Sequence, residues 1–391
     1  MPTTKRQDYL AFGMPDYTEE EIEAVARVMR SGWVGMGQET IAFEHELSDY
    51  IGAPEVVTVN SCTSALFLAL LVENVNVGDE VIVPSLTWCA TANAALYLGA
   101  TPVFCEIDAN SFCVTPKSIL EKVTPRTKAV IVVHYGGYAI DIDQLRNALP
   151  AHISIIEDAA HAMGARHANS TRVGASGNSV CFSFYANKNL STADGGAIAL
   201  FDSVKAERLR SLRMSGLASH AWSRYIKPSS AFDFALNDLG YKMNFTDLQS
   251  AIGRVQLRRL DGMAAIRKSL AERYRRRFDE YGLELVFQSG AFDERHARHL
   301  LVASCGEETT GLSRDGLLLA LREQNIGASI HYRPLHTQPL YQRYGPWKLP
   351  VTEAVAERIM TLPISARMTN EDVDYVCAHL TNIISPQRIT T

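Results

Sequence analysis

Lys188 and Asp158 each follow an apolar run that is typical of a buried strand. Lys188 lies in SFYANKNLSTADGG, between one such run and a Gly-Gly pair that begins the next. Asp158 ends the run IIED, and burying its carboxylate costs free energy unless a cation or a hydrogen-bond donor meets it. A protonated pyridine nitrogen is one suitable partner. Taken alone, each residue has a plainer interpretation, as a solvated loop lysine and as an aspartate that caps a helix.

Other predicted strand ends carry small hydroxyl groups and an indole. In TVNSCTSALF, Thr63, Ser64 and the amides around them lie at a helix N-terminus, which favours anions, although these residues can simply cap the helix. Trp88 follows the next strand and can cover a flat ring, or else belongs to the core or an interface. With Lys188 and Asp158, these residues provide the aldehyde trap, pyridinium partner, ring cover and phosphate cup that pyridoxal phosphate (PLP) requires.

Short apolar runs alternate with helical patterns between residues 55 and 200. The runs are continuous and rich in valine and isoleucine, as in EVVTV, AVIVVHY and ISIIED. Strands with both faces covered by helices have this composition, so the sequence predicts an α/β fold with a mainly parallel mixed sheet between helices. Ligands of such sheets bind at the carboxyl ends of the strands, where the residues named above lie.

The chain of 391 residues exceeds what one hydrophobic core usually holds, so we expect two domains. After residue 255 a long amphipathic helix over 256–283 leads into further helix and strand patterns. We assign residues 1–255 to a large PLP-binding domain and residues 256–391 to a smaller C-terminal α+β domain. Residues 1–40 form an N-terminal arm, in which YTEEEIEAVARVMRSG predicts a helix and GWVGMG a flexible segment.

Composition narrows the functional classes. The net charge is −5 and the basic residues are scattered, which argues against a nucleic-acid partner. The first residues lack the apolar core of a signal peptide, and no run approaches the length of a membrane span. The seven cysteines form no CxxC pair and no cluster with histidine, so we expect a reducing compartment and no metal site. A soluble cytoplasmic protein is the expectation, without a nucleic-acid or membrane partner.

Five segments carry a resemblance to a known family. They are PSLTWCATANAALYLGATPVFCEID, IEDAAHAMGA, SFYANKNLSTADGG, GYKMNFTDLQSAIG and IHYRPLHTQPLY. In this order they resemble the DegT/StrS group of PLP-dependent sugar aminotransferases, which have the aspartate-aminotransferase (type I) fold. The resemblance runs from about residue 10 to 385.

The resemblance implies roles at the cofactor ring. Lys188 binds the cofactor aldehyde as a Schiff base and later transfers a proton, and Asp158 pairs with the pyridinium nitrogen. Trp88 stacks on one ring face, and His161 lies near the ring hydroxyl, where family members have His or Gln. Because Lys188 acts as an uncharged amine, we expect its pKa to lie below the ordinary lysine value.

The same resemblance implies a phosphate cup made of Thr63, Ser183 and the amide of Cys62. Asn244, in YKMNFTDLQ, reaches the phosphate of the neighbouring subunit, which implies a homodimer with shared active sites. Two residues depart from the family's pattern. Cys62 stands where Gly or Ala is usual and narrows the cup slightly, while Asn187 stands where Thr is usual and leaves the hydrogen bonding of the lysine open.

The implied reaction moves an amino group from glutamate to a nucleotide-linked keto-deoxysugar, with the cofactor passing through pyridoxamine phosphate. From family frequency we expect a 4-keto-6-deoxyhexose. Four cations can bind its diphosphate or can be ordinary surface charges: Lys242, Arg213, Arg224 and Arg333. Three residues border the expected sugar pocket, or else belong to turns or core packing: Trp33, Met36 and His331.

Other functions stay open at this point. An aminotransferase of this family can instead act on a C3-keto sugar or an aminocyclitol. A sugar dehydratase of the same fold replaces the lysine by histidine or adds an iron–sulfur cluster, whereas Lys188 is present and clustered cysteines are absent. A non-catalytic regulator has no physical reason to keep Lys188, Asp158 and Trp88 together. The nucleotide, the sugar carbon and the pathway, such as lipopolysaccharide O-antigen synthesis, also stay open.

Overall fold

The apolar runs form a seven-stranded sheet in the computed structural model, which describes residues 4–217, 235–236 and 238–384. Each strand of this sheet lies where the sequence predicts one. In chain order they are β1 (Glu55–Val59), β2 (Glu80–Pro84), β3 (Thr101–Cys105), β4 (Thr127–Val133), β5 (Ser154–Asp158), β6 (Ser179–Ser183) and β7 (Gly196–Leu200). Strands β2, β6 and β7 are buried throughout, as expected for strands with both faces covered.

The sheet is mainly parallel, with the strand order β1-β7-β6-β5-β4-β2-β3. Strand β7 runs antiparallel to its neighbours β1 and β6, and the other neighbouring strands are parallel. Because β1, β2, β5 and β6 therefore share one direction, the residues that follow them meet at one edge of the sheet. The predicted α/β fold with a mainly parallel mixed sheet is confirmed.

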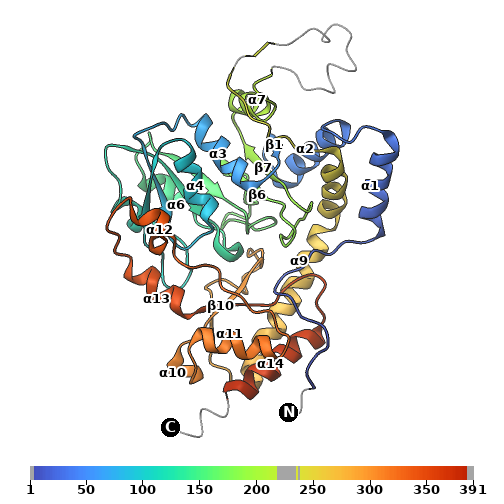
Figure 1. The fold of residues 1–391 in the computed structure, drawn as a ribbon, viewed down its shortest axis with the longest axis vertical. Helices are drawn as coiled ribbons and strands as arrows, with labels where there is room; N and C mark the ends of the chain where they lie inside the picture. The colour runs from blue at the N-terminus through green and yellow to red at the C-terminus, as the bar shows by residue number, and fades with distance from the viewer. Residues whose placement is uncertain (1–3, 218–234, 237, 385–391) are drawn as a thin grey trace.

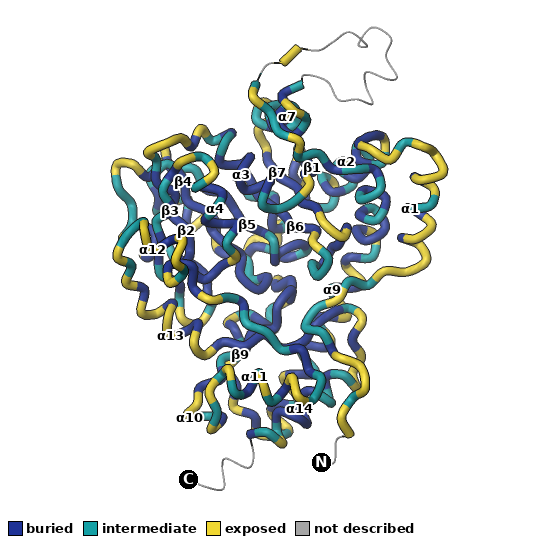
Figure 2. Tube along the Cα trace, in the orientation of Figure 1, coloured by how far each residue is buried: buried dark blue, intermediate teal, exposed yellow. Residues whose placement is uncertain are grey.

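Helices pack around this sheet (Figure 1). They are α2 (Gln38–Ile51), α3 (Cys62–Val72), α4 (Cys89–Tyr97), α5 (Pro116–Leu120), α6 (Ile142–Ala148) and α7 (Ser203–Leu212), with a 3₁₀ turn η1 (Tyr135–Gly137). Helix α3 is buried on nearly every side because it lies between the sheet and the helices α4 and α7. Its apolar residues therefore show no polar face, and Figure 2 shows this region as buried.

One long helix, α9 (Asp247–Tyr281), connects the sheet to the C-terminal part (Figure 1). It begins before the predicted residue 256, because the Thr246 side chain caps it by accepting a hydrogen bond from the Gln249 amide at 3.3 Å. It packs against α1 (Glu19–Ser31) and α2 near its start and against the C-terminal helix near its end. The proposed division after residue 255 therefore runs through a single helix.

The C-terminal part contains a three-stranded antiparallel sheet in the order β10-β9-β8. Its strands are β8 (Val286–Phe287), β9 (Leu301–Ser304) and β10 (Ile359–Leu362). Its helices are α10 (Glu307–Thr310), α11 (Arg314–Glu323), α12 (Pro339–Gln342), α13 (Pro350–Arg358) and α14 (Asn370–Ile384), with a 3₁₀ turn η3 (Leu335–Thr337). Strands and helices are mixed here, as the predicted α+β class requires.

Two segments pack outside the domain to which the sequence assigned them. Leu335, Tyr341 and Leu349, which flank or lie in α12, belong to the apolar core of the large sheet. Leu10, from the N-terminal arm, belongs to the C-terminal core, and its amide donates to the Asn325 carbonyl at 2.8 Å. The two parts of the molecule are thus joined by exchanged segments as well as by α9 (Figure 1).

The GWVGMG segment, which the sequence predicts to be flexible, is hydrogen-bonded to Asp247 of α9 in the structure. Asp247 holds the end of this segment at the N-terminus of α2, where its carboxylate accepts hydrogen bonds from the amides of Gly37 at 2.7 Å and Thr40 at 3.0 Å. The Trp33 indole also donates to the Met36 carbonyl at 3.2 Å. A carboxylate at a helix N-terminus is stabilised by the unpaired amides there, so the segment has a defined position.

Arg213 is a structural residue and not a free cation for a diphosphate. Its side chain is 2 % exposed, pairs with Glu44, and donates to the Thr58 carbonyl at 2.5 Å and the Thr58 hydroxyl at 3.1 Å. Glu44 also accepts from the Thr58 amide at 2.8 Å. Burial alone raises the pKa of Glu44, but Arg213 and Thr58 outweigh it and hold that pKa below the ordinary value.

Within the described residues, no helix combines the length and apolarity needed to cross a membrane.

Replacing Arg213 by Met leaves the Glu44 carboxylate buried without its cation. We expect Arg213→Met to lower the free energy of unfolding by about 3 kcal/mol, measured by urea denaturation. Arg210→Met is the matched control, since Arg210 pairs at 2.6 Å with the partly exposed Glu55 and its loss should cost less than about 1 kcal/mol. Equal losses in the two variants would contradict this assignment.

Candidate active site

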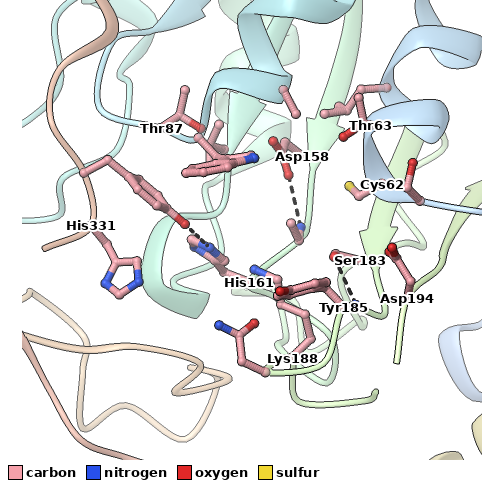
Figure 3. Close-up of a pocket in the computed structure, with 18 residues that line it drawn as sticks. Cys62, Thr63, Thr87, Asp158, His161, Ser183, Tyr185, Lys188, Asp194 and His331 are labelled. Atoms are coloured by element: carbon pink, nitrogen blue, oxygen red, sulfur yellow. Dashed lines mark hydrogen bonds between the residues drawn. The ribbon is translucent and has the colours of Figure 1, made fainter. Parts of the chain in front are cut away.

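A cavity of about 450 Å³ opens at the carboxyl edge of the large sheet (Figure 3). The loops after β1, β2, β5 and β6 line it, together with a segment of the C-terminal part. Eight of the residues predicted from the sequence lie on its wall: Cys62, Thr63, Trp88, Asp158, His161, Ser183, Lys188 and His331. In Figure 3, Cys62, Thr63 and Ser183 gather on one side of the cavity, with His161 and His331 on the other.

Asp158 ends β5, in register with Val133 of β4 and Cys181 of β6. Its carboxylate accepts hydrogen bonds from the Thr91 hydroxyl at 2.8 Å and the Ala160 amide at 3.1 Å. No helix begins at Asp158, so it is not a helix cap. Burial raises the pKa of Asp158, because these two uncharged donors and the nearby Lys188 only partly offset the loss of solvent. The carboxylate can therefore gain much from a cation inside the cavity.

Lys188 lies on the loop between β6 and β7, where its amide donates to the Tyr185 carbonyl at 2.9 Å. Its side chain is half-buried and points into the cavity (Figure 3). Burial lowers the pKa of Lys188 to about 8, although Cys62 and Asp158 act in the opposite direction. Near neutral pH a much larger fraction of this amine is uncharged than for an exposed lysine, which is what a nucleophile or a general base requires.

His161 is held as a neutral imidazole of one tautomer. Its Nδ1 accepts a hydrogen bond from the Gly136 amide at 3.3 Å, so the proton is on Nε2, which lies 3.1 Å from the Tyr332 hydroxyl oxygen. Burial, followed by the charge of Lys188, lowers the pKa of His161 well below its ordinary value. The ring can therefore donate a hydrogen bond to an acceptor without bringing a positive charge into the cavity.

The N-terminus of α3 provides an anion site at the cavity wall. Ser61 caps the helix by accepting from the Ser64 amide at 3.1 Å, which leaves the first-turn amides of Cys62 and Thr63 outside the helical hydrogen bonds. The start of β7 lies very close to this turn, since a Cβ added at Gly196 would be 2.7 Å from the Cys62 nitrogen. The hydroxyls of Thr63 and Ser183 line the same region.

Trp88 is not a core residue, since 61 % of it is exposed although it lines the cavity. Its ring centroid lies 5.8 Å from that of Tyr332, with a tilt of 51°. An exposed indole at this position has a free face for a flat ligand. This arrangement favours the ring-cover interpretation over the core interpretation.

Five predicted residues are not on the described wall of this cavity: Trp33, Met36, Lys242, Asn244 and Arg333. Lys242 and Asn244 lie together, with the lysine donating to the Asn244 side-chain oxygen at 2.5 Å. Arg333 is exposed, next to the cavity residue Tyr332. Arg224 lies outside the described residues.

The sequence patterns did not point to Tyr332 on the cavity wall, or to Thr91 and His299, which contact the wall residues Asp158 and Lys188. Thr91 has a detectable signal, because it lies three residues after Trp88 on the first turn of α4, at a spacing that shares a helix face. Tyr332 adjoins His331 and was overlooked beside it. His299, whose Nε2 lies 3.3 Å from the Lys188 amine, is separated from that lysine by 111 residues and has no local signal.

The match to known proteins covers nearly the whole chain. Residues 15–381 match the model of the DegT/DnrJ/EryC1/StrS aminotransferase family. The spore coat polysaccharide biosynthesis protein SpsC of Bacillus subtilis (strain 168) is 39 % identical over 386 residues, which cover 97 % of this chain and 98 % of SpsC.

Solved structures agree with this match. Spr1654 of Streptococcus pneumoniae, named as a sugar aminotransferase and solved in a PMP form, is 28 % identical with a TM-score of 0.89 over 97 % of this chain and 99 % of its own. The PLP form of the same protein has a TM-score of 0.88. PseC of Helicobacter pylori, an aminotransferase involved in pseudoaminic acid biosynthesis, is 25 % identical with a TM-score of 0.88 over 97 % of this chain and 100 % of its own.

The residues on the cavity wall fit PLP. A lysine amine, a buried carboxylate without a charged donor, an exposed aromatic face and a helix N-terminus with unpaired amides all face one space. Each can meet one part of this cofactor: its aldehyde, its ring nitrogen, its ring face and its phosphate. The chain belongs to the DegT/DnrJ/EryC1/StrS aminotransferase family and is a PLP-dependent enzyme.

Proposed function

We propose that the enzyme transfers an amino group from glutamate to a nucleotide-linked keto-deoxysugar, with a 4-keto-6-deoxyhexose as the acceptor. The names of SpsC, Spr1654 and PseC support a sugar acceptor, because they refer to polysaccharide biosynthesis, sugar aminotransfer and pseudoaminic acid. We place the reaction in the cytoplasm, in agreement with the seven free cysteines of the chain.

The observation that carries this proposal is that Lys188 and Asp158 face one cavity. PLP, when bound, supplies an aldehyde for an amine and a ring that withdraws electrons. Lys188 binds the aldehyde carbon, and Asp158 holds the ring nitrogen in its protonated form. The buried carboxylate of Asp158 gains its missing cation in this way, so cofactor binding relieves the cost of its burial.

The remaining wall residues orient the cofactor. Trp88 would cover one ring face, and His161, whose proton is on Nε2, would donate toward the ring hydroxyl. Thr63, Ser183 and the Cys62 amide bind the phosphate, where the dipole of α3 adds to the attraction.

Lys188 also moves the proton that the reaction requires. When not bonded to the cofactor, its amine would accept a proton from the substrate and give it back at another position. Its lowered pKa supports this role, because the uncharged amine accepts a proton and the charged form can still donate one near pH 8. The half-buried position of Lys188 limits competing exchange with water.

We further propose that two copies of the chain share each active site. Asn244 lies outside the cavity of its own chain, and we assign its side chain to the phosphate in the partner subunit. Lys242, which hydrogen-bonds to Asn244, then lies near the same site and is a candidate contact for the substrate diphosphate. Trp33, Met36 and Arg333 remain candidate substrate contacts from the surrounding segments, and His331 is one on the cavity wall.

Lys188→Ala tests the central role. We expect transamination to fall by at least about 10³-fold, since both the covalent attachment and the proton transfer are lost. Borohydride reduction followed by peptide mass spectrometry should attach the cofactor to Lys188 in the wild type and to no lysine in the variant. Lys205→Ala is the control, because Lys205 pairs with Glu73 at 2.6 Å away from the cavity and its loss should leave the rate unchanged. Wild-type turnover by Lys188→Ala would refute the proposal.

Mixed dimers test the shared site. Asn244→Ala should weaken PLP retention, measured by cofactor loss on dialysis, and lower activity. When Lys188→Ala and Asn244→Ala subunits are refolded together, each mixed dimer should regain one intact site, because the intact lysine of one subunit meets the intact asparagine of the other. If the refolded mixture is no more active than the two variants refolded separately, or if a monomer is fully active, the shared site is contradicted.

A panel of acceptors identifies the substrate. The pyridoxamine phosphate form of the enzyme is mixed with UDP-, dTDP- and GDP-linked 3-keto and 4-keto sugars, and recovery of PLP absorbance is recorded. We expect the fastest recovery with a 4-keto-6-deoxyhexose. Faster recovery with a 3-keto sugar would replace the proposed acceptor without affecting the role of Lys188.

A further inference from the structure

His299 brings a third group to Lys188 from the C-terminal part of the chain. Its Nε2 lies 3.3 Å from the Lys188 amine, within hydrogen-bond range. The side chain is 5 % exposed, and its other ring nitrogen, Nδ1, is buried without a partner among the described residues. Among the described residues, Lys188 is therefore the one hydrogen-bond partner of the His299 ring.

Backbone contacts on both sides fix the position of this histidine. The Ala297 amide donates to the Gly137 carbonyl at 3.0 Å, and the Leu300 amide donates to the Gly136 carbonyl at 3.0 Å. The side-chain amide of Asn189, the residue after Lys188, donates to the Ala297 carbonyl at 2.8 Å. The segment that carries His299 is thus tied both to the turn beside His161 and to the loop of Lys188.

The residue before His299 adds a local constraint. Arg298 has a φ of +50°, a left-handed conformation that a non-glycine residue rarely adopts unless its surroundings require it. The buried Arg267 of α9 donates to the Arg298 carbonyl at 3.4 Å and to the Ile364 carbonyl at 3.0 Å. This backbone turn presents the His299 ring to the cavity side, where its centroid lies 4.6 Å from that of His161.

The chemistry of the two groups determines the direction of the hydrogen bond. A charged lysine amine has only donors, so a neutral imidazole must accept from it. Burial, and then the charge of Lys188, lowers the pKa of His299 well below its ordinary value, so the ring is neutral. With Nε2 as the acceptor, the ring proton lies on Nδ1. The same contact to an uncharged amine leaves the lone pair of that amine free to accept a proton.

We propose that His299 is a positioning residue for Lys188, whose Nε2 accepts a hydrogen bond from the lysine amine and orients its lone pair during proton transfer. This inference rests on the proposed role of Lys188 in catalysis. It assigns to the C-terminal part a direct contact with the reacting lysine.

Several titratable groups surround Lys188, and two of them, Cys62 and Asp158, raise its pKa against the effect of burial. Those on or beside the cavity wall are Asp158, Cys62, Tyr185, Asp194, His161, His299 and His331. The test therefore uses variants that replace only His299 and leave the other groups around Lys188 unchanged.

The first measurement is the acylation of Lys188 by trace acetic anhydride in the full-length enzyme in its pyridoxamine phosphate form. Only the uncharged amine reacts, so labelling falls as the pH drops through the pKa of Lys188. Loss of an acceptor disfavours the charged amine, so His299→Phe should shift the midpoint downward by about one unit. His299→Gln keeps a hydrogen-bond acceptor, so its labelling midpoint should lie close to the wild-type value. His379→Phe is the control, because His379 is another buried histidine with an unpartnered ring nitrogen but lies on α14.

Turnover gives the second readout. His299→Phe should lower kcat by about tenfold with little change in KM, even though more of the amine is uncharged at neutral pH. His299→Gln should recover most of this loss. A purely structural role would not raise the fraction of reactive amine while lowering kcat. An unchanged or upward-shifted labelling midpoint in His299→Phe, or a Gln variant that behaves like Phe, would overturn the proposal.

The wild type offers a test that does not depend on how the variants fold. In ¹⁵N-histidine NMR spectra of the pyridoxamine phosphate form, with the His299 signals assigned by their loss in His299→Gln, the proton should lie on Nδ1. A proton on Nε2 would overturn the proposal. These measurements read the contact between His299 and Lys188 directly, so they can fail while Lys188→Ala still abolishes turnover. Conversely, wild-type turnover by Lys188→Ala would refute the catalytic role of the lysine. The Lys188 labelling and the His299 tautomer measured in the wild type would not be affected by that result.

Discussion

The carboxylate of Asp158 is buried at the end of a central strand with only uncharged hydrogen-bond donors in the described structure. Removing a carboxylate from water in this way is costly, and a cation at the same place recovers much of that cost. The cavity beside it has a lysine with a lowered pKa, a neutral histidine and an anion site at a helix N-terminus. The wall is therefore complementary to a ligand with a cationic ring nitrogen, an electrophilic carbon and a phosphate.

The parallel sheet explains how these groups come together. Strands β1, β2, β5 and β6 end at the same edge, so Cys62, Trp88, Asp158 and Lys188 follow them into one space although more than a hundred residues separate the first from the last. Rigid strands hold such groups more precisely than free loops do. The reversed strand β7 brings Gly196 against the N-terminus of α3, where the absence of a side chain permits the close approach.

The C-terminal part completes the cavity and does not merely stabilise the molecule. It supplies His331, Tyr332 and the proposed contact from His299, while α12 packs into the core of the large sheet. The N-terminal arm crosses in the opposite direction, with Leu10 in the C-terminal core. These exchanged contacts resist separation of the two parts. The geometry at Lys188 therefore depends on interactions that no single segment contains.

Local patterns in the sequence determined the strands, the main helices and the groups at the strand ends, because alternating apolar runs and small polar residues carry that information within a few positions. The resemblance to a family was carried by short motifs around Lys188, Asp158 and Asn244 for the same reason. Only the tertiary structure decided that Arg213 is buried with Glu44, that GWVGMG is held by Asp247, and that His299 reaches Lys188. Each of these contacts joins residues far apart in the chain, and the distance between such residues depends on the packing of whole elements and not on the pattern near either one.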